Sequence, residues 1–252
     1  KSFVNRLISE GLLLDTLEWV QGQKAPVEAV RFPYQKFSDH IIARYLLGKF
    51  LNTSDEKSVK ASFYEDAALG AFFKQDRIIY DRSGIVEALM IEFPTRIRNE
   101  GELLDYLDSE NITGASVAAF MNGLIWRAPA SINDSTSKWV NVLLGHAHFK
   151  NNIMDILVAL AAKPKHPYSA AKLNRFLKSM KMNKRDLFWS EFLRKQDHHN
   201  SIYRILSWIE MTRVQSIGNE YARMYALIMM WTLTSTNRSL RDRATRALYY
   251  IG

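Results

Sequence analysis

The sequence contains no cysteine. Disulfides, thiolate zinc sites and cysteine nucleophiles are therefore excluded together. Long hydrophobic runs are also absent: the longest strongly apolar stretch, Met224–Leu233, is about half of what a bilayer span requires. The N-terminus shows no charged start followed by an apolar core and a small-residue cleavage site. We therefore expect a cytoplasmic protein that neither enters a membrane nor is secreted.

Motifs that carry chemistry are missing as well. Gly48-Lys49 lacks the upstream glycine and the following Ser or Thr of a phosphate-binding loop. Asp55-Glu56 follows polar residues, so a helix N-terminus explains the two acids without a metal. The four histidines that occur as close pairs (146 and 148, 198 and 199) lack the i, i+4 spacing of helical metal ligands. No nucleophile motif of the form Gly-x-Ser-x-Gly is present. We predict that this chain is not an enzyme and carries no metal or cofactor site of its own.

The pattern of apolar residues changes near residue 35. Residues 3–8 read as the end of a helix, and Leu13, Leu17 and Trp19 alternate as in a strand. A Gly/Pro turn at residues 21–26 precedes a second alternating segment that includes Val30. A helix followed by two strands and a turn resembles the end of a winged-helix module, with residues 21–26 as its wing. We assign residues 1–51 to this module and its connecting helix.

Beyond Pro33 nearly everything is predicted to be helical, which makes the fold class mainly α. Residues 39–51 are predicted to form a helix, because their apolar side chains recur at helical spacing. The apolar stripe consists of Ile42, Tyr45, Leu46 and Phe50. Residues 52–252 form the predicted helical domain, an irregular or solenoid-like set of helix pairs. The further expected helices cover residues 64–75, 83–93, 101–108, 114–127, 134–146, 149–162, 168–180, 184–196, 200–210, 217–235 and 239–251. The run 224–233 is apolar all round, which predicts a central helix covered on both sides.

The positive charge is concentrated in the C-terminal half. Residues 1–130 hold 15 Lys/Arg and 18 Asp/Glu, whereas residues 131–252 hold 19 and 8, which gives net charges of −3 and +11. The densest stretch is 163–195, where Lys172, Arg175 and Lys178 recur every three residues. The candidate contacts to nucleic acid or to an acidic partner are Lys165, Lys172, Arg175, Lys178 and Lys181. The alternative is a solvated helix face opposite an apolar side that consists of Leu173, Phe176, Leu177 and Met180. We favour this alternative, because no recognition helix for nucleic acid is identifiable.

The last predicted helix combines an apolar stripe with several arginines. Leu240, Ala244, Ala247 and Ile251 form the stripe, Ser239 is the expected cap, and Asp242 lies four residues from two arginines. Because the charge exceeds what helix stability needs, we predict structural contacts with the end of the preceding helix or with an adjacent domain. The candidate interdomain or structural residues are Arg238, Arg241, Asp242, Arg243 and Arg246. We expect both ends of the sequence to be cut from a longer chain.

Five stretches resemble, in the same order, the segment that follows the nucleotide-binding domain in large bacterial STAND-type NTPases, the AAA+/NACHT-like signal-transduction ATPases with numerous domains. They are residues 30–47 (VRFPYQKFSDHIIARYLL), 84–94 (GIVEALMIEFP), 124–129 (LIWRAP), 185–189 (RDLFW) and 235–248 (STNRSLRDRATRAL). The last stretch is the most specific of the five.

The resemblance implies a regulatory role. In such proteins, some of them antiviral, an upstream domain binds ATP and Mg²⁺, a winged helix follows, and helical repeats sense a trigger and control assembly. No Walker residue has a counterpart here, so no ATPase residue carries over. The implied partners are the other domains of the parent protein, further copies of it, and a phage protein. The alternative hypothesis is a helical module that binds nucleic acid through its basic half.

Overall fold

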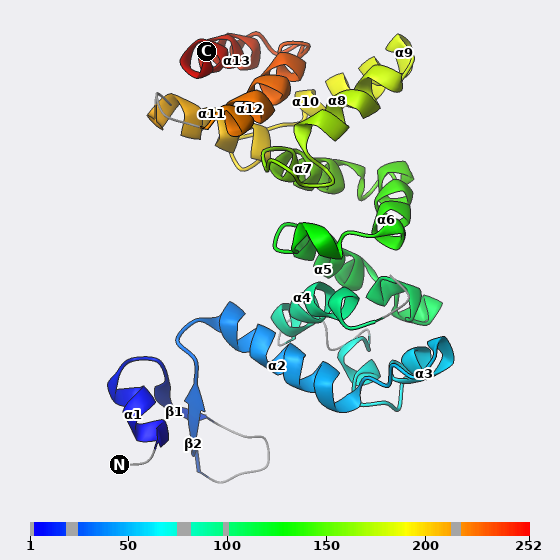
Figure 1. Ribbon diagram of the computed structural model, residues 1–252, viewed down its shortest axis with the longest axis vertical. Helices are drawn as coiled ribbons and strands as arrows, with labels where there is room; N and C mark the ends of the chain where they lie inside the picture. Colours follow the sequence, from blue (N-terminus) through cyan, green and yellow to red (C-terminus); the bar gives the residue numbers. More distant parts are fainter. Residues whose placement is uncertain (1–2, 19–24, 75–81, 98–100, 213–217) are drawn as a thin grey trace. The chain divides into compact units, whose positions relative to one another are not determined.

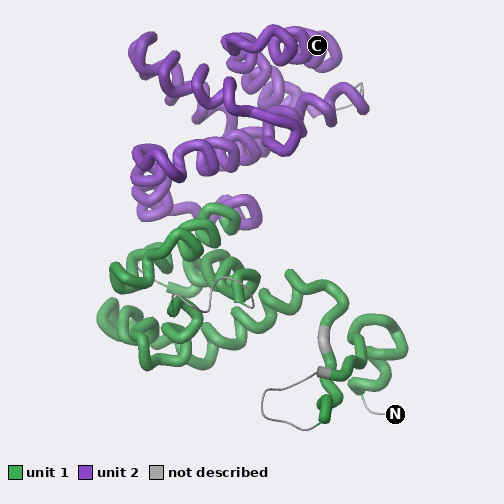
Figure 2. The backbone as a smooth tube through the Cα atoms, turned by 180° about the vertical axis from the view of Figure 1, so that it is seen from behind, with its two compact units in different colours: residues 1–123 green, residues 124–252 purple. Residues whose placement is uncertain are grey.

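The computed structural model describes residues 3–18, 25–74, 82–97, 101–212 and 218–252. The protein is mainly helical, with one small antiparallel β-hairpin (Figure 1). It divides into two compact units, unit 1 (residues 1–123) and unit 2 (residues 124–252) (Figure 2). The boundary between the two units falls far beyond residue 51, where the sequence suggested a change of domain.

Unit 1 begins with a helix and a hairpin. Strands β1 and β2 pair antiparallel with Leu14 opposite Arg31 and Glu18 opposite Val27. The predicted hairpin is thus confirmed, while its wing lies mostly outside the described residues and its winged-helix identity stays a prediction. The elements of unit 1 are α1 (Phe3–Ser9), β1 (Leu14–Glu18), β2 (Val27–Arg31), α2 (Gln35–Phe50), α3 (Glu56–Ala61), α4 (Ser83–Glu92) and α5 (Gly114–Leu124), with short 3₁₀ turns at Gly70–Phe72, Phe93–Thr95, Leu103–Asp105 and Ser109–Asn111.

The core of unit 1 lies between α2, α4 and the turns that follow them. Phe63, Phe73, Phe93 and Tyr106 meet edge to face, with ring centroids 5.4–6.0 Å apart. Such contacts between aromatic rings add to the burial of their apolar surface. The ring cluster ties segments that are far apart in sequence into one packed body.

Two predicted helices of unit 1 are wrong. Of the predicted helix 64–75, the described residues 64–74 form one short 3₁₀ helix at Gly70, where a Cβ atom would collide with the backbone carbonyl of Tyr64. The chain therefore folds back at a position that only glycine permits. Residues 101–108 contain a 3₁₀ turn instead of an α-helix, and Asp105 Oδ2 accepts a hydrogen bond from the Glu102 backbone amide at 2.8 Å.

Unit 2 is built around α7. The buried side chains of α7 include Ile153 and Val158, and this helix packs against α6, α8 and α11. The elements of unit 2 are α6 (Asp134–Gly145), α7 (Lys150–Ala161), α8 (Ala170–Ser179), α9 (Met182–Arg185), a π-helical turn (Asp186–Ser190), α10 (Glu191–Arg194), α11 (Ser201–Thr212), α12 (Asn219–Thr232) and α13 (Arg238–Ile251), with a 3₁₀ turn at Pro129–Ser131. Most helices predicted for this half are confirmed.

The predicted helix 184–196 is interrupted by the π-helical turn. Within that turn Trp189 is almost fully buried, and its indole Nε1 donates a hydrogen bond to the Trp231 carbonyl at 2.9 Å. A π-turn changes the angle between successive side chains, so the helix can bury Trp189 while Leu187 stays exposed. The prediction that Trp189 lies in the core is confirmed.

The apolar run 224–233 forms the second half of α12, with Leu233 as its C-cap, and is largely covered. Helix α12 packs against α13, α8 and α7. Within the run only Met230 is exposed, at 58%, and the other side chains are buried or half-buried. The predicted central helix is therefore confirmed, except that this one side chain stays at the surface.

Candidate functional site

The N-terminal part of unit 1 has no buried core. No described residue before Asp39 is buried. Large apolar side chains lie exposed instead on α1, the hairpin and the segment leading into α2. They are Phe3, Val4, Leu12, Leu14, Leu17, Val27, Val30 and Tyr34. A high density of exposed apolar side chains in one segment indicates an interaction site.

Helix α2 adds further exposed apolar side chains within unit 1. One side of α2 packs on α4 and buries Ala43 and Leu47. The opposite side exposes Phe37, Ile41 and Tyr45, which recur every four residues and are 55%, 38% and 60% exposed. We call these three residues the α2 stripe. The α2 stripe is apolar surface on a helix whose other side is already covered.

The α2 stripe also connects to the hairpin region. The rings of Phe32 and Phe37 meet edge to face with centroids 5.1 Å apart. At the other end of the stripe, Lys49 Nζ donates a hydrogen bond to Tyr45 Oη at 3.0 Å. The apolar surface thus runs from the strand end to the last turns of α2 and ends at a cation.

Sequence reasoning missed the α2 stripe. The predicted stripe contained Tyr45 and Phe50, which are both exposed, together with two half-buried residues. The true buried face contains Asp39 and the small residue Ala43, so hydrophobicity alone does not reveal it. The spacing of Phe37, Ile41 and Tyr45 was a visible signal, and it indicated a second apolar face.

Polar contacts fix the buried side of α2. Glu92 of α4 accepts hydrogen bonds from His40 Nδ1 and Arg44 Nε, both at 3.0 Å. Burial opposes the ionisation of Glu92, but the hydrogen bonds from Arg44 and His40 outweigh it, so the pKa of Glu92 is lowered. The Gln35 side chain also donates to Asp39 Oδ1 at 2.8 Å. The two contacts with Glu92 hold α2 on α4 and so determine which side of α2 remains exposed.

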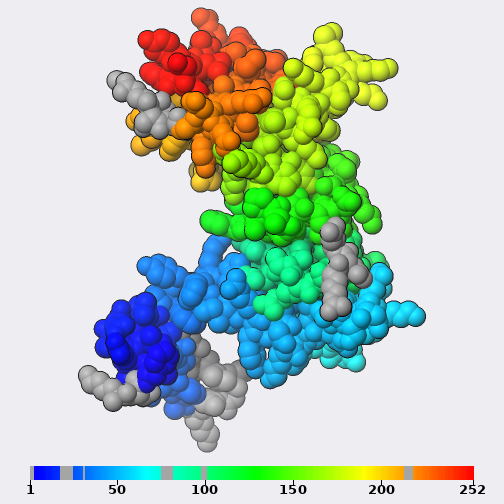
Figure 3. All heavy atoms as spheres, in the orientation of Figure 1, coloured from blue at the N-terminus to red at the C-terminus, as the bar shows by residue number. Residues whose placement is uncertain are grey.

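A second candidate surface is the basic face of α8 and α9 in unit 2. Lys172, Arg175, Lys178, Lys181 and Lys184 are all exposed, and Leu173 and Leu177 are buried on the other side of α8. In the space-filling view, the yellow-green side chains of this region project at the surface of unit 2 (Figure 3). We call these five cations the α8–α9 basic face.

The candidate cations differ in whether an acid lies beside them. Lys165, which was grouped with these cations in the sequence, lies near Glu220, with Nζ and Oε2 3.8 Å apart. Asp186 Oδ1 lies 3.7 Å from Arg185 Nε. Among the described residues, no ion pair reaches Arg175, Lys178 or Lys181. Lys165 therefore has an acidic neighbour that these three cations lack.

Aromatic side chains border the basic face. Phe176 of α8 is 38% exposed and meets the half-buried Phe188 edge to face, with centroids 5.7 Å apart. Lys150 Nζ lies over the Phe188 ring at 4.6 Å, and Lys172 Nζ lies 5.7 Å from the Tyr168 ring. Two lysines and Phe176 therefore each lie against an aromatic ring in this region of unit 2.

The arginines of α13 make contacts within unit 2. Arg243 donates two hydrogen bonds to Glu210 of α11, at 3.1 and 2.7 Å, and a third to Ser207 Oγ at 3.1 Å. Arg241 Nη1 donates to the Ser235 carbonyl at 2.7 Å, just beyond the end of α12. Thus Arg243 joins α13 to α11, and Arg241 closes the turn between α12 and α13.

The other two α13 arginines are loosely held. Arg246 lies 3.7 Å from Glu210, and the weak pair between Arg238 and Asp242 spans 3.8 Å. The predicted apolar stripe is confirmed, since Leu240, Ala244 and Ala247 are fully buried and Ile251 is half-buried. The predicted cap is wrong: the side chain of Asn237, and not that of Ser239, accepts the amide hydrogen bond of Leu240. The α13 arginines thus contribute to packing within unit 2.

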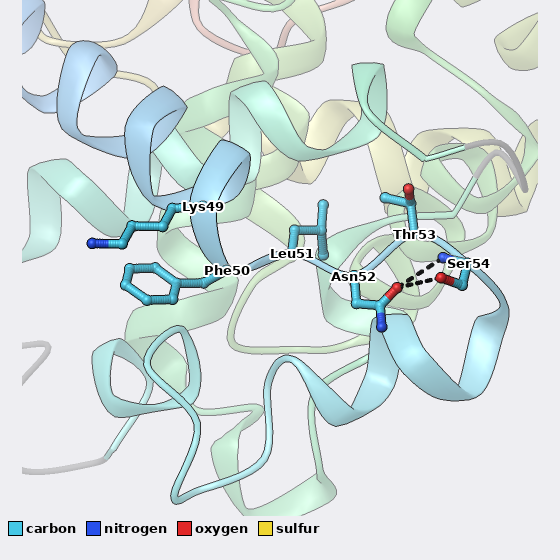
Figure 4. A pocket seen from close by; sticks show the side chains of 6 residues that line it. All are labelled: Lys49, Phe50, Leu51, Asn52, Thr53 and Ser54. Atoms are coloured by element: carbon cyan, nitrogen blue, oxygen red, sulfur yellow. Dashed lines mark hydrogen bonds between the residues drawn. The ribbon is translucent and has the colours of Figure 1, made fainter.

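A wide, open pocket of about 460 Å³ lies between α2 and α3, where residues 49–54 line it (Figure 4). The Asn52 side chain accepts hydrogen bonds from the amide and hydroxyl of Ser54, at 3.1 and 2.6 Å. Asp55 caps α3 by accepting the Ser58 amide hydrogen bond at 2.8 Å, which explains the acid at this position. The pocket is a turn surface whose polar groups already bond to one another.

Three of the four histidines that occur as close pairs contact aromatic rings. His146 and His148 both lie against Phe149, and His198 meets Tyr203. Within the described ranges, no group of three or more His, Asp or Glu residues is placed to hold a metal ion.

None of the helices in the described part of the chain has the length and apolar composition needed to span a bilayer.

Comparison with known proteins gives no match: no family model, no curated protein and no solved structure matches the chain. The fold alone therefore classifies this chain, as a mainly helical protein of two compact units. Its two most distinctive surfaces are the apolar N-terminal surface with the α2 stripe and the α8–α9 basic face.

Proposed function

We propose that this chain is a non-catalytic coupling segment of a STAND-type NTPase. In this proposal the N-terminal surface and the α2 stripe dock on a nucleotide-binding domain, and the helical units connect that domain to a sensor region. ATP and Mg²⁺ belong to the nucleotide-binding domain. The observation that carries the proposal is the absence of any buried described residue before Asp39.

Energetics support docking by this part of the chain. Burying one large apolar side chain stabilises an interface by about 1.5–3 kcal/mol. The α2 stripe alone offers three such side chains on a helix that is held rigidly by Glu92 on its other side. A preorganised apolar helix face binds a partner surface with little additional ordering cost.

The coupling role follows from the position of α2. This helix carries the exposed stripe on one face and the contacts to α4 on the other. A change in the partner domain that shifts α2 would act directly on the His40–Glu92–Arg44 contacts and on the aromatic core behind them. Coupling of this kind works by favouring one of two packings. Any role in phage defence would depend on the trigger that the sensor region recognises.

The test measures binding of the chain to the separately produced nucleotide-binding domain of its parent protein. The double variant Ile41→Ser/Tyr45→Ser should weaken this binding at least tenfold, because it removes two apolar contacts. The matched control Met211→Ser/Tyr249→Ser removes two exposed apolar side chains of unit 2 and should bind like the wild type.

Calorimetry with nucleotide provides the second arm. ATP should bind the parent protein and not this chain alone. Tight ATP binding by the isolated chain would overturn the proposed division of labour. Equal weakening by both double variants, or no association at all with the nucleotide-binding domain, would overturn the docking surface.

A further inference from the structure

The α8–α9 basic face carries more uncompensated charge than any packing role of α8 requires. In the described part of the chain, the helices α7 and α12 make the closest packing on α8, and each contains a single acid. Asp155 of α7 accepts hydrogen bonds from the amide and hydroxyl of Ser201, and Glu220 of α12 lies beside Lys165. Both acids are therefore engaged away from Arg175, Lys178 and Lys181.

The cations lie in a row. Lys172, Arg175 and Lys178 are three residues apart on α8, which places their Cα atoms about 4.5 Å apart along the helix axis. Lys181 and Lys184 follow in the exposed segment beyond the end of this helix. Like charges in such an array repel one another, and the repulsion is relieved by a partner that carries a regular row of anions. A nucleic acid backbone is such a partner, and release of its counterions favours binding.

The adjacent rings distinguish between forms of nucleic acid. Phe176 has an exposed ring at the border of the row, and Phe188 supports it edge to face. An exposed ring beside a line of cations is the arrangement that binds single strands, whose unpaired bases stack on aromatic side chains. A duplex keeps its bases paired and would use the cations alone.

We propose that the α8–α9 basic face binds single-stranded nucleic acid, with the cations on successive phosphates and Phe176 stacked on a base. Recognition of this kind does not depend on base sequence, because neither phosphate contacts nor stacking involves the hydrogen-bonding groups at the edges of the bases. The proposal is independent of the coupling function, since it uses only residues of unit 2.

The test is fluorescence anisotropy of the full 252-residue chain with a labelled 20-nucleotide DNA or RNA strand between 50 and 200 mM salt. The triple variant Lys172→Gln/Arg175→Gln/Lys178→Gln should bind at least tenfold more weakly at 50 mM salt. Its slope of log K against log salt should be smaller by about 2, because each phosphate contact on a single strand contributes roughly 0.7. The corresponding triple change to Glu should abolish binding.

A control variant carries the same change in charge elsewhere. Lys57, Lys138 and Arg223 are exposed cations outside the basic face, and changing all three to Gln should leave most of the affinity. Phe176→Leu keeps an apolar side chain on Phe188 but removes the ring, so it should weaken binding of the single strand several-fold and leave duplex binding unchanged. Circular dichroism of each variant checks that it folds.

Several results would overturn the proposal. One is that the single strand does not bind at 50 mM salt, and another is that the control and test variants lose the same affinity. The others are that a duplex binds more tightly than the single strand, and that Phe176→Leu has no effect on binding. Binding to vesicles of anionic lipid, or to an acidic peptide, that exceeds binding to the single strand would assign the basic face to a different partner.

Discussion

The bond between Arg243 and Glu210 should be the strongest polar link between α13 and the rest of unit 2. Both side chains are largely buried, with exposed fractions of 17% and 26%, and the guanidinium donates two hydrogen bonds to the carboxylate. Arg243 also bonds to Ser207 and lies over the Tyr203 ring at 5.3 Å. The perturbation is Arg243→Met, which keeps an apolar stem and removes the charge.

The expected magnitude follows from this geometry. A hydrogen bond to a charged group contributes about 1.5–3 kcal/mol when it is shielded from water. Solvent screening of partly exposed pairs reduces that figure. We therefore expect Arg243→Met to lower the free energy of unfolding of unit 2 by about 2 kcal/mol. In a double-mutant cycle with Glu210→Gln, the coupling energy should be about 1–1.5 kcal/mol.

The assay is urea denaturation followed by tryptophan fluorescence. Five of the six tryptophans lie in residues 124–252, so the signal reports mainly on unit 2. The coupling should also depend on pH. The hydrogen bond from Arg243 lowers the pKa of Glu210 against the opposing effect of burial. The stabilisation is therefore present above the ordinary pKa of a glutamate and is lost as the pH falls through the lowered pKa.

The control is Arg238→Met on the same helix. Arg238 is 87% exposed and lies 3.8 Å from Asp242, so its removal should change the free energy of unfolding by less than about 0.5 kcal/mol. A coupling energy below about 0.3 kcal/mol would refute the reasoning, as would equal destabilisation by the two arginine variants. In that case the apolar stripe alone would hold α13.

Three further changes test the packing. Burial, aided by the charge of Lys163, lowers the pKa of His166 to about 4, so below pH 6.5 the unfolded state binds more protons than the folded state. Unfolding experiments at a series of pH values should therefore show up to about 3 kcal/mol of stability lost between pH 6.5 and 4. The variant His166→Asn should remove most of that loss. Gly70→Ala should cost at least about 2 kcal/mol in a thermal melt, because its Cβ would meet the Tyr64 carbonyl; a wild-type melting temperature would contradict this. Asp155→Ala should cost about 1–2 kcal/mol in urea, because it removes two hydrogen bonds to the first turn of α11, and an unchanged midpoint would count against the contact.

Buried helix faces could be predicted from the sequence where the local spacing of apolar residues decides which face is buried. The stripe of α13 contains Leu240, Ala244 and Ala247, and its spacing of three and four residues allows only one buried face. The burial of Trp189 was also predictable, although the π-turn that contains it was not. The hydrogen bond from the Trp189 indole to the distant Trp231 carbonyl was not predictable either, because no local pattern encodes it.

The sequence by itself determined the mainly helical class, the hairpin and the concentration of positive charge in the second half, because composition and short-range spacing are sufficient for these. Only the tertiary structure decided which charges are compensated and which apolar faces are covered. Arg243 meets Glu210 from another helix, whereas Arg175 meets no acid in the part of the chain that is described. Phe37 and Ile41 are exposed because Ala43 and Leu47 of the same helix already face α4. Charge pairing and burial depend on neighbours far away in sequence, and the fold supplies those neighbours.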